Sequence, residues 1–157
     1  MKYIAKIPLM AMVLLAVCFS NTNAQGGDAS GLGIRAGLGL NPDQFVVGAQ
    51  FSIGKKAGIA RIVPSVDLGF GDNVTTIVFN ADFLFRLRVE DTNFGLYGGG
   101  SPTLVFYDFE GGSNWDFGVT GVVGIELNII KGHPNNLELR LGIGDVPDLR
   151  LLLTFML

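Results

Sequence analysis

Apolar and polar residues alternate along nearly the whole chain from Gly31 onward. In the clearest stretch, residues 75–89, every odd position from 77 is apolar, while the even positions include asparagine, aspartate and arginine. A period of two is typical of a β-strand with two different faces, and no stretch after Gly31 shows a convincing helical period. The pattern predicts eight strands, over residues 31–40, 45–53, 61–70, 75–89, 94–107, 115–129, 137–144 and 149–157.

Short segments rich in glycine, proline, asparagine and aspartate separate these runs. The predicted links are residues 41–43, 54–58, 71–73, 90–93, 109–114, 131–136 and 144–148. A parallel crossover needs about a dozen residues or more, so links of this length favour antiparallel hairpins. The expected fold is therefore all-β, an eight-stranded antiparallel up-and-down barrel that closes between its first and last strands. Pro64 and Pro102 lie inside runs and are expected to form bulges or to shorten their strands.

The first segment, residues 1–24, has the layout of a secretory signal peptide. It opens with two lysines, continues with an apolar run over residues 9–19 and ends on the small residues around Ala24. The apolar run is too short to span a bilayer as a helix, so we expect export and cleavage after Ala24. A lipoprotein signal using Cys18 is the alternative, although Val17 occupies a position where glycine, alanine or serine is usual.

The mature chain, residues 25–157, is then expected to be one barrel domain with a short lead over residues 25–30. Without Lys2 and Lys6 it has 11 − 2 = 9 basic and 14 acidic side chains, a net charge of 9 − 14 = −5. With 48% apolar and 16% charged residues in the full chain, the composition excludes a disordered chain or a coiled coil. The acidic balance argues against nucleic acid as a partner. Cys18 is the only cysteine, so no disulfide holds the mature fold.

The second face of each run decides which side of the barrel lies outside. It consists mostly of glycine and other small residues, which suit the narrow interior of an eight-stranded barrel better than a water-facing surface. The charged side chains on this face are Arg35, Arg61, Asp67, Asp82, Arg86, Arg88, Asp116, Glu126, Glu138, Arg140 and Arg150. Six arginines and five carboxylates sum to 6 − 5 = +1. Enclosed charges are costly unless paired, so we expect a charge network that keeps the lumen closed. Ordinary surface charge on a soluble barrel is the alternative.

Strand direction predicts how these charges are distributed along the barrel. Arg35, Asp67 and Asp82 are expected near its middle, where Arg35 would pair with one or both carboxylates. The charges expected towards the end that carries the chain termini, on the periplasmic side, are Arg61, Arg86, Arg88, Glu126, Glu138 and Arg140.

Aromatic residues of the apolar face gather near the ends of the runs. They are Phe45, Phe51, Phe70, Phe94, Phe106, Trp115, Phe117 and Phe155. Membrane barrels place aromatic girdles at both interfaces, although Phe79, Phe83 and Phe85 continue through mid-strand. Aromatics that fill a soluble core would explain this feature nearly as well.

The leader, the eight alternating runs and the closing segment, residues 148–157, resemble the small outer-membrane β-barrel superfamily of OmpA/OmpX type. This resemblance implies a monomeric barrel in the outer membrane, surrounded by lipid, with periplasmic chaperones and the barrel-insertion machinery as partners during biogenesis. Two features depart from the pattern. The chain ends on Leu157 rather than on an aromatic residue, and all its links are short, which argues against adhesion or receptor roles.

The sequence contains little that indicates catalysis. His133, the only histidine, is predicted in a turn, and no zinc spacing, EF-hand or Walker loop is present. We therefore expect no cofactor and no enzymatic activity. The leading interpretation is a structural or weakly conducting outer-membrane barrel. A secreted, lipocalin-like soluble barrel that binds a small apolar ligand is the alternative, and an outer-membrane enzyme is the third class.

Overall fold

The computed structural model describes residues 31–53, 59–87, 94–130 and 133–157, and within them the fold is all-β. Its strands are β1 (Gly31–Leu40), β2 (Gln44–Ser52), β3 (Ala60–Phe70), β4 (Val74–Leu87), β5 (Phe94–Phe109), β6 (Gly112–Ile130), β7 (His133–Gly144) and β8 (Leu149–Met156). The described part of the chain contains no helix long and apolar enough to cross a membrane.

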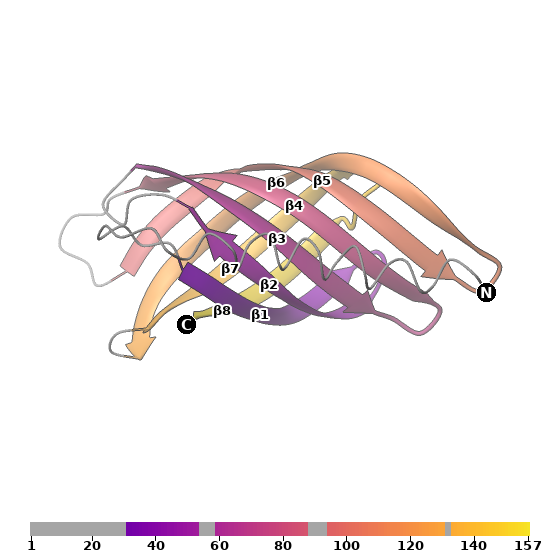
Figure 1. Ribbon diagram of the computed structural model, residues 1–157, viewed down its shortest axis with the longest axis horizontal. Coiled ribbons are helices and arrows are strands. Elements are labelled where there is room, and N and C mark those ends of the chain that lie inside the picture. Colours follow the sequence, from indigo (N-terminus) through magenta and orange to yellow (C-terminus); the bar gives the residue numbers. More distant parts are fainter. Residues whose placement is uncertain (1–30, 54–58, 88–93, 131–132) are drawn as a thin grey trace.

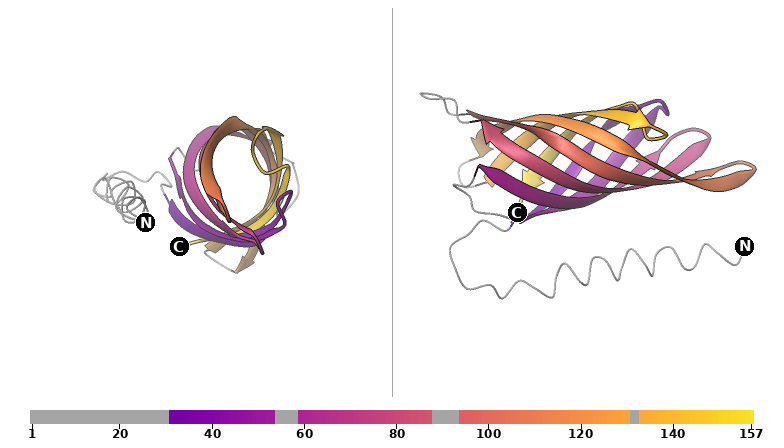
Figure 2. Two further views of the ribbon diagram at one scale, coloured as in Figure 1. Left: turned by 90° about the vertical axis from the view of Figure 1, so that its right-hand side faces the viewer. Right: turned by 90° about the horizontal axis from the view of Figure 1, so that it is seen from above.

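The eight strands form one closed barrel (Figures 1 and 2). Each strand pairs antiparallel with the next, and β1 pairs antiparallel with β8 from Gly33↔Met156 to Leu40↔Leu149. Closure gives every strand two neighbours, so the sheet has no full-length free edge. The predicted up-and-down barrel is confirmed.

An even number of strands brings both ends of the described barrel to the same side. The backbone N–H of Leu157 donates to the carbonyl of Leu32 at 2.8 Å. We call this side the terminal end. The turns after β1, β3, β5 and β7 lie at the opposite side, the distal end, where the β5–β6 hairpin reaches furthest (Figure 2, right).

Two predicted links are shorter than expected. Strands β5 and β6 pair without interruption up to Phe109↔Gly112, so their hairpin closes at residues 110–111, where Gly111 has φ = 122°. A glycine with positive φ allows a tight turn, and residues 112–114 therefore continue the strand. The other link was expected over residues 131–136, but β7 begins at His133. Pairing of Asn135 with Leu127 on β6 overrides the turn preference of asparagine.

Neither proline forms a bulge or breaks its strand. Pro64 lies within the 11-residue β3, and Pro102 within the 16-residue β5. Each strand keeps one register on both sides of its proline, with Pro64 opposite Ala81 and Pro102 opposite Val119. The missing N–H removes only local bonds on the other side, since the β4–β5 pairing resumes in the same register beyond Pro102.

The alternation separates an apolar outer wall from a largely polar interior. Among the described residues, 25 large apolar side chains are exposed, including Leu38 at 61% and Phe117 at 64%. Apart from glycine and proline, 18 of the buried residues are polar or charged and only 9 are apolar. The hydrophobic pattern is thus inverted relative to a water-soluble barrel, in which the apolar face fills the interior.

Candidate functional site

Six buried charges form a connected group inside the barrel, which we call the central network. Its members are Arg35, Asp67, Asp82, Glu138, Arg140 and Arg150, and each side chain is at most 1% exposed. Three arginines and three carboxylates make the group neutral, 3 − 3 = 0. Buried charges need this kind of compensation, because each costs several kcal/mol when it is left unpaired.

Arg35 forms an ion pair with Asp67 across the intervening strand β2. The guanidinium donates from Nε to Asp67 Oδ1 at 2.5 Å and from Nη2 to Oδ2 at 2.6 Å. Both residues are in register with Gly48 of β2, one on each side of it. A Cβ at Gly48 would lie 2.2 Å from Asp67 Oδ1, so the absent side chain leaves the space in which the ion pair forms. Arg150 adds a second donor to Asp67 Oδ2, from Nη1 at 3.2 Å.

Arg140 joins the other two carboxylates. It donates to both oxygens of Asp82, and from Nε to Glu138 Oε2 at 3.1 Å. Arg35 Nη1 lies 3.8 Å from Glu138 Oε2, which links the two halves of the network. Arginine suits this position, because its planar fork serves two carboxylates at once.

Tyr97 completes the surroundings of Glu138 by donating its hydroxyl at 2.7 Å. Its strand and that of Glu138 lie on either side of β6, and both residues are in register with Gly124. A Cβ at Gly124 would lie 2.2 Å from the Tyr97 ring. Gly124 thus makes room for the contact between Tyr97 and Glu138, as Gly48 does for the ion pair between Arg35 and Asp67.

Neutral polar side chains bind several of the remaining donors and acceptors of the central network, although Arg150 Nε is buried without a hydrogen-bond partner among the described residues. Arg35 donates to Ser65 Oγ at 2.7 Å and to Gln50 Oε1 at 3.2 Å. Asn80 donates to Asp67 Oδ2 and accepts from Arg150 Nη2, each at 3.3 Å. Such shared contacts hold each charged group in one position.

Apolar layers lie on both sides of this polar level. On β4 the inward residues run Val78, Asn80, Asp82, Leu84 from the distal towards the terminal end. Leu84 belongs to a buried cluster with Val63, Tyr97 and Val122, and Val78 to a second cluster with Val105 and Val146. The central network therefore lies between two apolar layers, where charge pairing is stronger than in water.

A smaller group of charges lies nearer the terminal end. Arg61 Nη1 contacts Glu126 Oε1 at 2.9 Å, and Arg86 pairs with the other oxygen of Glu126. The guanidinium of Arg61 also lies 4.5 Å from the centre of the Tyr97 ring. The side chains of Arg61 and Arg86 are 25% and 44% exposed, so this group is partly solvated.

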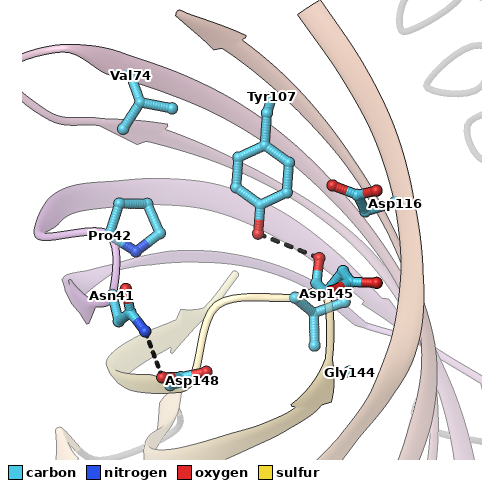
Figure 3. Close-up of a pocket in the computed structure, with 9 residues that line it drawn as sticks. Asn41, Pro42, Val74, Tyr107, Asp116, Gly144, Asp145 and Asp148 are labelled. Atoms are coloured by element: carbon cyan, nitrogen blue, oxygen red, sulfur yellow. Dashed lines mark hydrogen bonds between the residues drawn. The ribbon is translucent and has the colours of Figure 1, made fainter.

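Asp116 lies apart from both groups, in a pocket at the distal mouth (Figure 3). The pocket has a volume of about 390 Å³, and Tyr107, Asp145 and Asp148 also line it. Asp116 accepts a hydrogen bond from Asn114 Nδ2 at 2.7 Å. No group of three or more histidine, cysteine, aspartate or glutamate residues in the described part of the chain is arranged to hold a metal ion.

Some of the charges expected in the lumen have other partners or other positions along the barrel than the sequence predicted. Arg35 pairs with Asp67, whereas Asp82 pairs with Arg140. Glu138 and Arg140 were expected towards the terminal end, but the stagger of β7 against its neighbours brings them to the central level. Arg88 lies outside the described residues.

Sequence reasoning did not single out the neutral partners of these charges. They are Gln50, Ser65, Asn80 and Tyr97, and the hydroxyls of Thr103 and Thr120 extend the network from Asn80. All of them fall on the inner face by alternation, which was the available signal, but their hydroxyl and amide groups do not stand out among the small residues of that face.

The comparisons with known proteins concern the fold only. No protein-family model and no curated protein sequence matches the chain. Among solved structures, Neisserial surface protein A is similar at 10% sequence identity and a TM-score of 0.49, over 82% of this chain and 93% of that one. The barrel assignment rests on the closed ladder of strands described above.

Proposed function

We propose that this protein is a non-enzymatic barrel of a bacterial outer membrane, structural or weakly conducting, whose lumen is kept closed by the central network. The inverted distribution of side chains carries this proposal. Exposed apolar residues such as Leu38, Leu139 and Leu151 cover the wall, whereas the six charges of the central network lie inside. In water, an exterior of this kind would be an aggregation hazard, but in lipid it is what a spanning barrel requires.

The row Leu38–Leu151–Leu139 illustrates how continuous this wall is. Leu151 is in register with Leu38 on one side and Leu139 on the other, and the three side chains are 61%, 47% and 41% exposed. Strands of ~9–11 tilted residues cross the hydrocarbon region, and strands β1, β2 and β3 have 10, 9 and 11. The wall thus has the length and the surface for a bilayer.

Aromatic side chains near the distal end add support. Phe45 and Phe70 are in register with each other and are 53% and 51% exposed. Phe106 packs against Trp115 with ring centroids 4.9 Å apart, and Trp115 is 48% exposed. Aromatic belts of this kind lie at the membrane–water interface of outer-membrane barrels.

The leader ending at Ala24 agrees with export to the outer membrane. In this assignment the terminal end faces the periplasm, and the turns at the distal end face outward. Outer-membrane lipid surrounds the wall, chaperones and the insertion machinery act during biogenesis, and the folded protein is a monomer. A lipocalin-like carrier fits the structure less well. Such a carrier needs an apolar cavity for its ligand, whereas paired charges occupy the middle of this interior.

Fractionation of cells that express the full chain tests the location. We expect the protein in the outer-membrane fraction, released by detergent but not by salt, and we expect its gel mobility to change when the sample is boiled. Recovery as a soluble periplasmic or secreted protein without detergent would overturn the proposal.

Single-channel recording tests whether the lumen is closed. Because the charges of the central network are paired and lie between apolar layers, the purified protein should conduct very little in a planar bilayer. Large, steady currents from the unmodified protein would instead identify it as an open pore.

A further inference from the structure

The connection between β7 and β8, residues 145–148, turns into the barrel mouth instead of away from it. Val146 is 3% exposed, although it belongs to a loop of four residues. The aspartates at both ends of this segment are exposed, so only its middle enters the lumen. A short loop that buries an apolar side chain inside the barrel is held in a specific position there.

The walls of the barrel form a seat for Val146. The side chain packs in one buried cluster with Val78 and Val105. Two glycines line the other side of the seat. A Cβ at Gly118 would lie 2.8 Å from Val146 Cγ1, and one at Gly142 would lie 2.9 Å from Cγ2. An added Cβ would also meet backbone, at 2.6 Å from the carbonyl oxygen of Ile143 for Gly118 and at 2.3 Å from that of Pro147 for Gly142.

Polar contacts fasten the segment at both ends (Figure 3). Tyr107 donates its hydroxyl to the carbonyl of Asp145 at 3.3 Å, and Asn41 donates from Nδ2 to Asp148 Oδ2 at 2.5 Å. The N–H of Gly142 donates to the carbonyl of Asp148 at 2.8 Å. The first two bonds are exposed to solvent, so each contributes little and can be exchanged for water.

The segment also has a pivot. Gly144, the last residue of β7, has φ = 97°, a conformation that side-chain-bearing residues rarely adopt. Carboxylates of Asp116, Asp145 and Asp148 share the mouth pocket, and like charges repel. The closed position is therefore held by the apolar seat and the backbone contacts, and not by ion pairing.

We propose that residues 145–148 form a hinged lid that seals the distal mouth of the lumen, as a second barrier in series with the central network. Opening the lid exposes Val105 and the hydroxyl pair Thr103–Thr120 below it, while the central network stays closed. The lid follows from contacts within the barrel. Only its assignment to the outward side rests on the proposed function.

Cysteine accessibility tests the lid directly, because the mature chain contains no cysteine of its own. A membrane-impermeant maleimide is added to the folded, detergent-solubilised barrel that carries Val105→Cys, with Ser113→Cys on the exposed β5–β6 hairpin as the reference. Val105 is 0% exposed, so with the lid closed its cysteine should react more than about tenfold more slowly than the reference.

Displacing the lid should remove this protection. Gly118→Val fills the seat, although it also crowds the carbonyl oxygen of Ile143 on β7, and should raise the labelling rate of Val105→Cys by about tenfold or more, since local opening then dominates. The matched control is Gly112→Val, on the same strand, where an added Cβ meets nothing within 4 Å. Val146→Asp should displace the lid without adding a side chain to the barrel wall. It therefore keeps the test valid if Gly118→Val does not fold. Heat-modifiable migration on a gel verifies that each variant is folded.

Two results would overturn the lid. One is rapid labelling of Val105→Cys in the otherwise unmodified barrel. The other is unchanged protection in folded Gly118→Val and Val146→Asp. Neither result depends on the membrane, and a barrel that is soluble without detergent would refute the proposed function while leaving this labelling pattern intact.

Discussion

At the scale of single residues, glycine creates the space in which buried polar contacts form. Gly48 lies between Arg35 and Asp67, and Gly124 lies between Tyr97 and Glu138. In each case the partners come from strands that are not adjacent and meet over the bare backbone of the strand between them. A barrel this narrow can hold large charged side chains because small residues face them.

The buried ion pair predicts a large effect of removing its cation. Arg35→Ala leaves Asp67 with Arg150 as its remaining ion-pair partner in the described part of the chain and should lower the free energy of unfolding by about 3–5 kcal/mol. Arg61→Ala is the control, because its partner Glu126 is partly solvated and also pairs with Arg86, and it should cost about 1 kcal/mol or less. Urea unfolding of the barrel in lipid vesicles measures both. Equal losses would show that the burial of the Arg35–Asp67 pair adds nothing to stability.

Alternation along the strands predicted the six buried charges of the central network on the inner face, but not all of their pairings. Alternation along one strand places Arg35, Asp67 and Arg140 on the inner face. Which of them meet depends on the stagger between strands, a property of the closed barrel that no single run contains. This is why Asp82 was assigned to Arg35 as a possible partner, although it pairs with Arg140 in the structure.

At the scale of the strands, close approach of neighbouring backbones explains some glycines and not others. A Cβ at Gly99 would lie 1.9 Å from the carbonyl oxygen of Phe83 on β4, whereas a Cβ at the adjacent Gly100 would have its nearest neighbour at 3.9 Å. The two residues point to opposite faces of β5. Gly99 is therefore required by the close packing of β4 against β5, whereas Gly100 is not and has only the general cost of a glycine in a strand.

Substituting these two glycines should give opposite results. Gly99→Ala forces β4 and β5 apart and should destabilise the barrel by roughly 1–3 kcal/mol. Gly100→Ala should be neutral or stabilising by up to about 1 kcal/mol, because alanine restricts the unfolded chain. The midpoint of thermal or urea unfolding reports both. A more harmful Gly100→Ala would mean that β5 is oriented the other way round.

Strand ends were harder to predict than strands. Residues 112–114 and 133–136 have compositions typical of turns, yet they continue β6 and β7 because a neighbouring strand offers them backbone partners. Pro64 and Pro102 were expected to disturb their strands, and each removes only local bonds on one side. Long-range pairing outweighs local preference in all these segments.

At the scale of the whole molecule, the exposed apolar wall should tolerate a charge only near its rim. Leu151→Arg places a cation in the middle of the wall and should cost about 2–4 kcal/mol in vesicles. Leu157→Arg is the control, because Leu157 directly follows β8, is 68% exposed and should cost about 0–1 kcal/mol. Equilibrium unfolding from vesicles compares them. A Leu151→Arg barrel as stable as the control would mean that lipid does not surround this wall.

The dependence of folding on lipid tests the account most directly. Residues 25–157 are diluted from urea into buffer with or without phospholipid vesicles, and folding is followed by heat-modifiable gel migration and by resistance to trypsin. Because the apolar side chains face outward, we predict a protected, heat-modifiable barrel with vesicles and aggregation without them. A folded, monomeric barrel in buffer free of lipid and detergent would contradict the account.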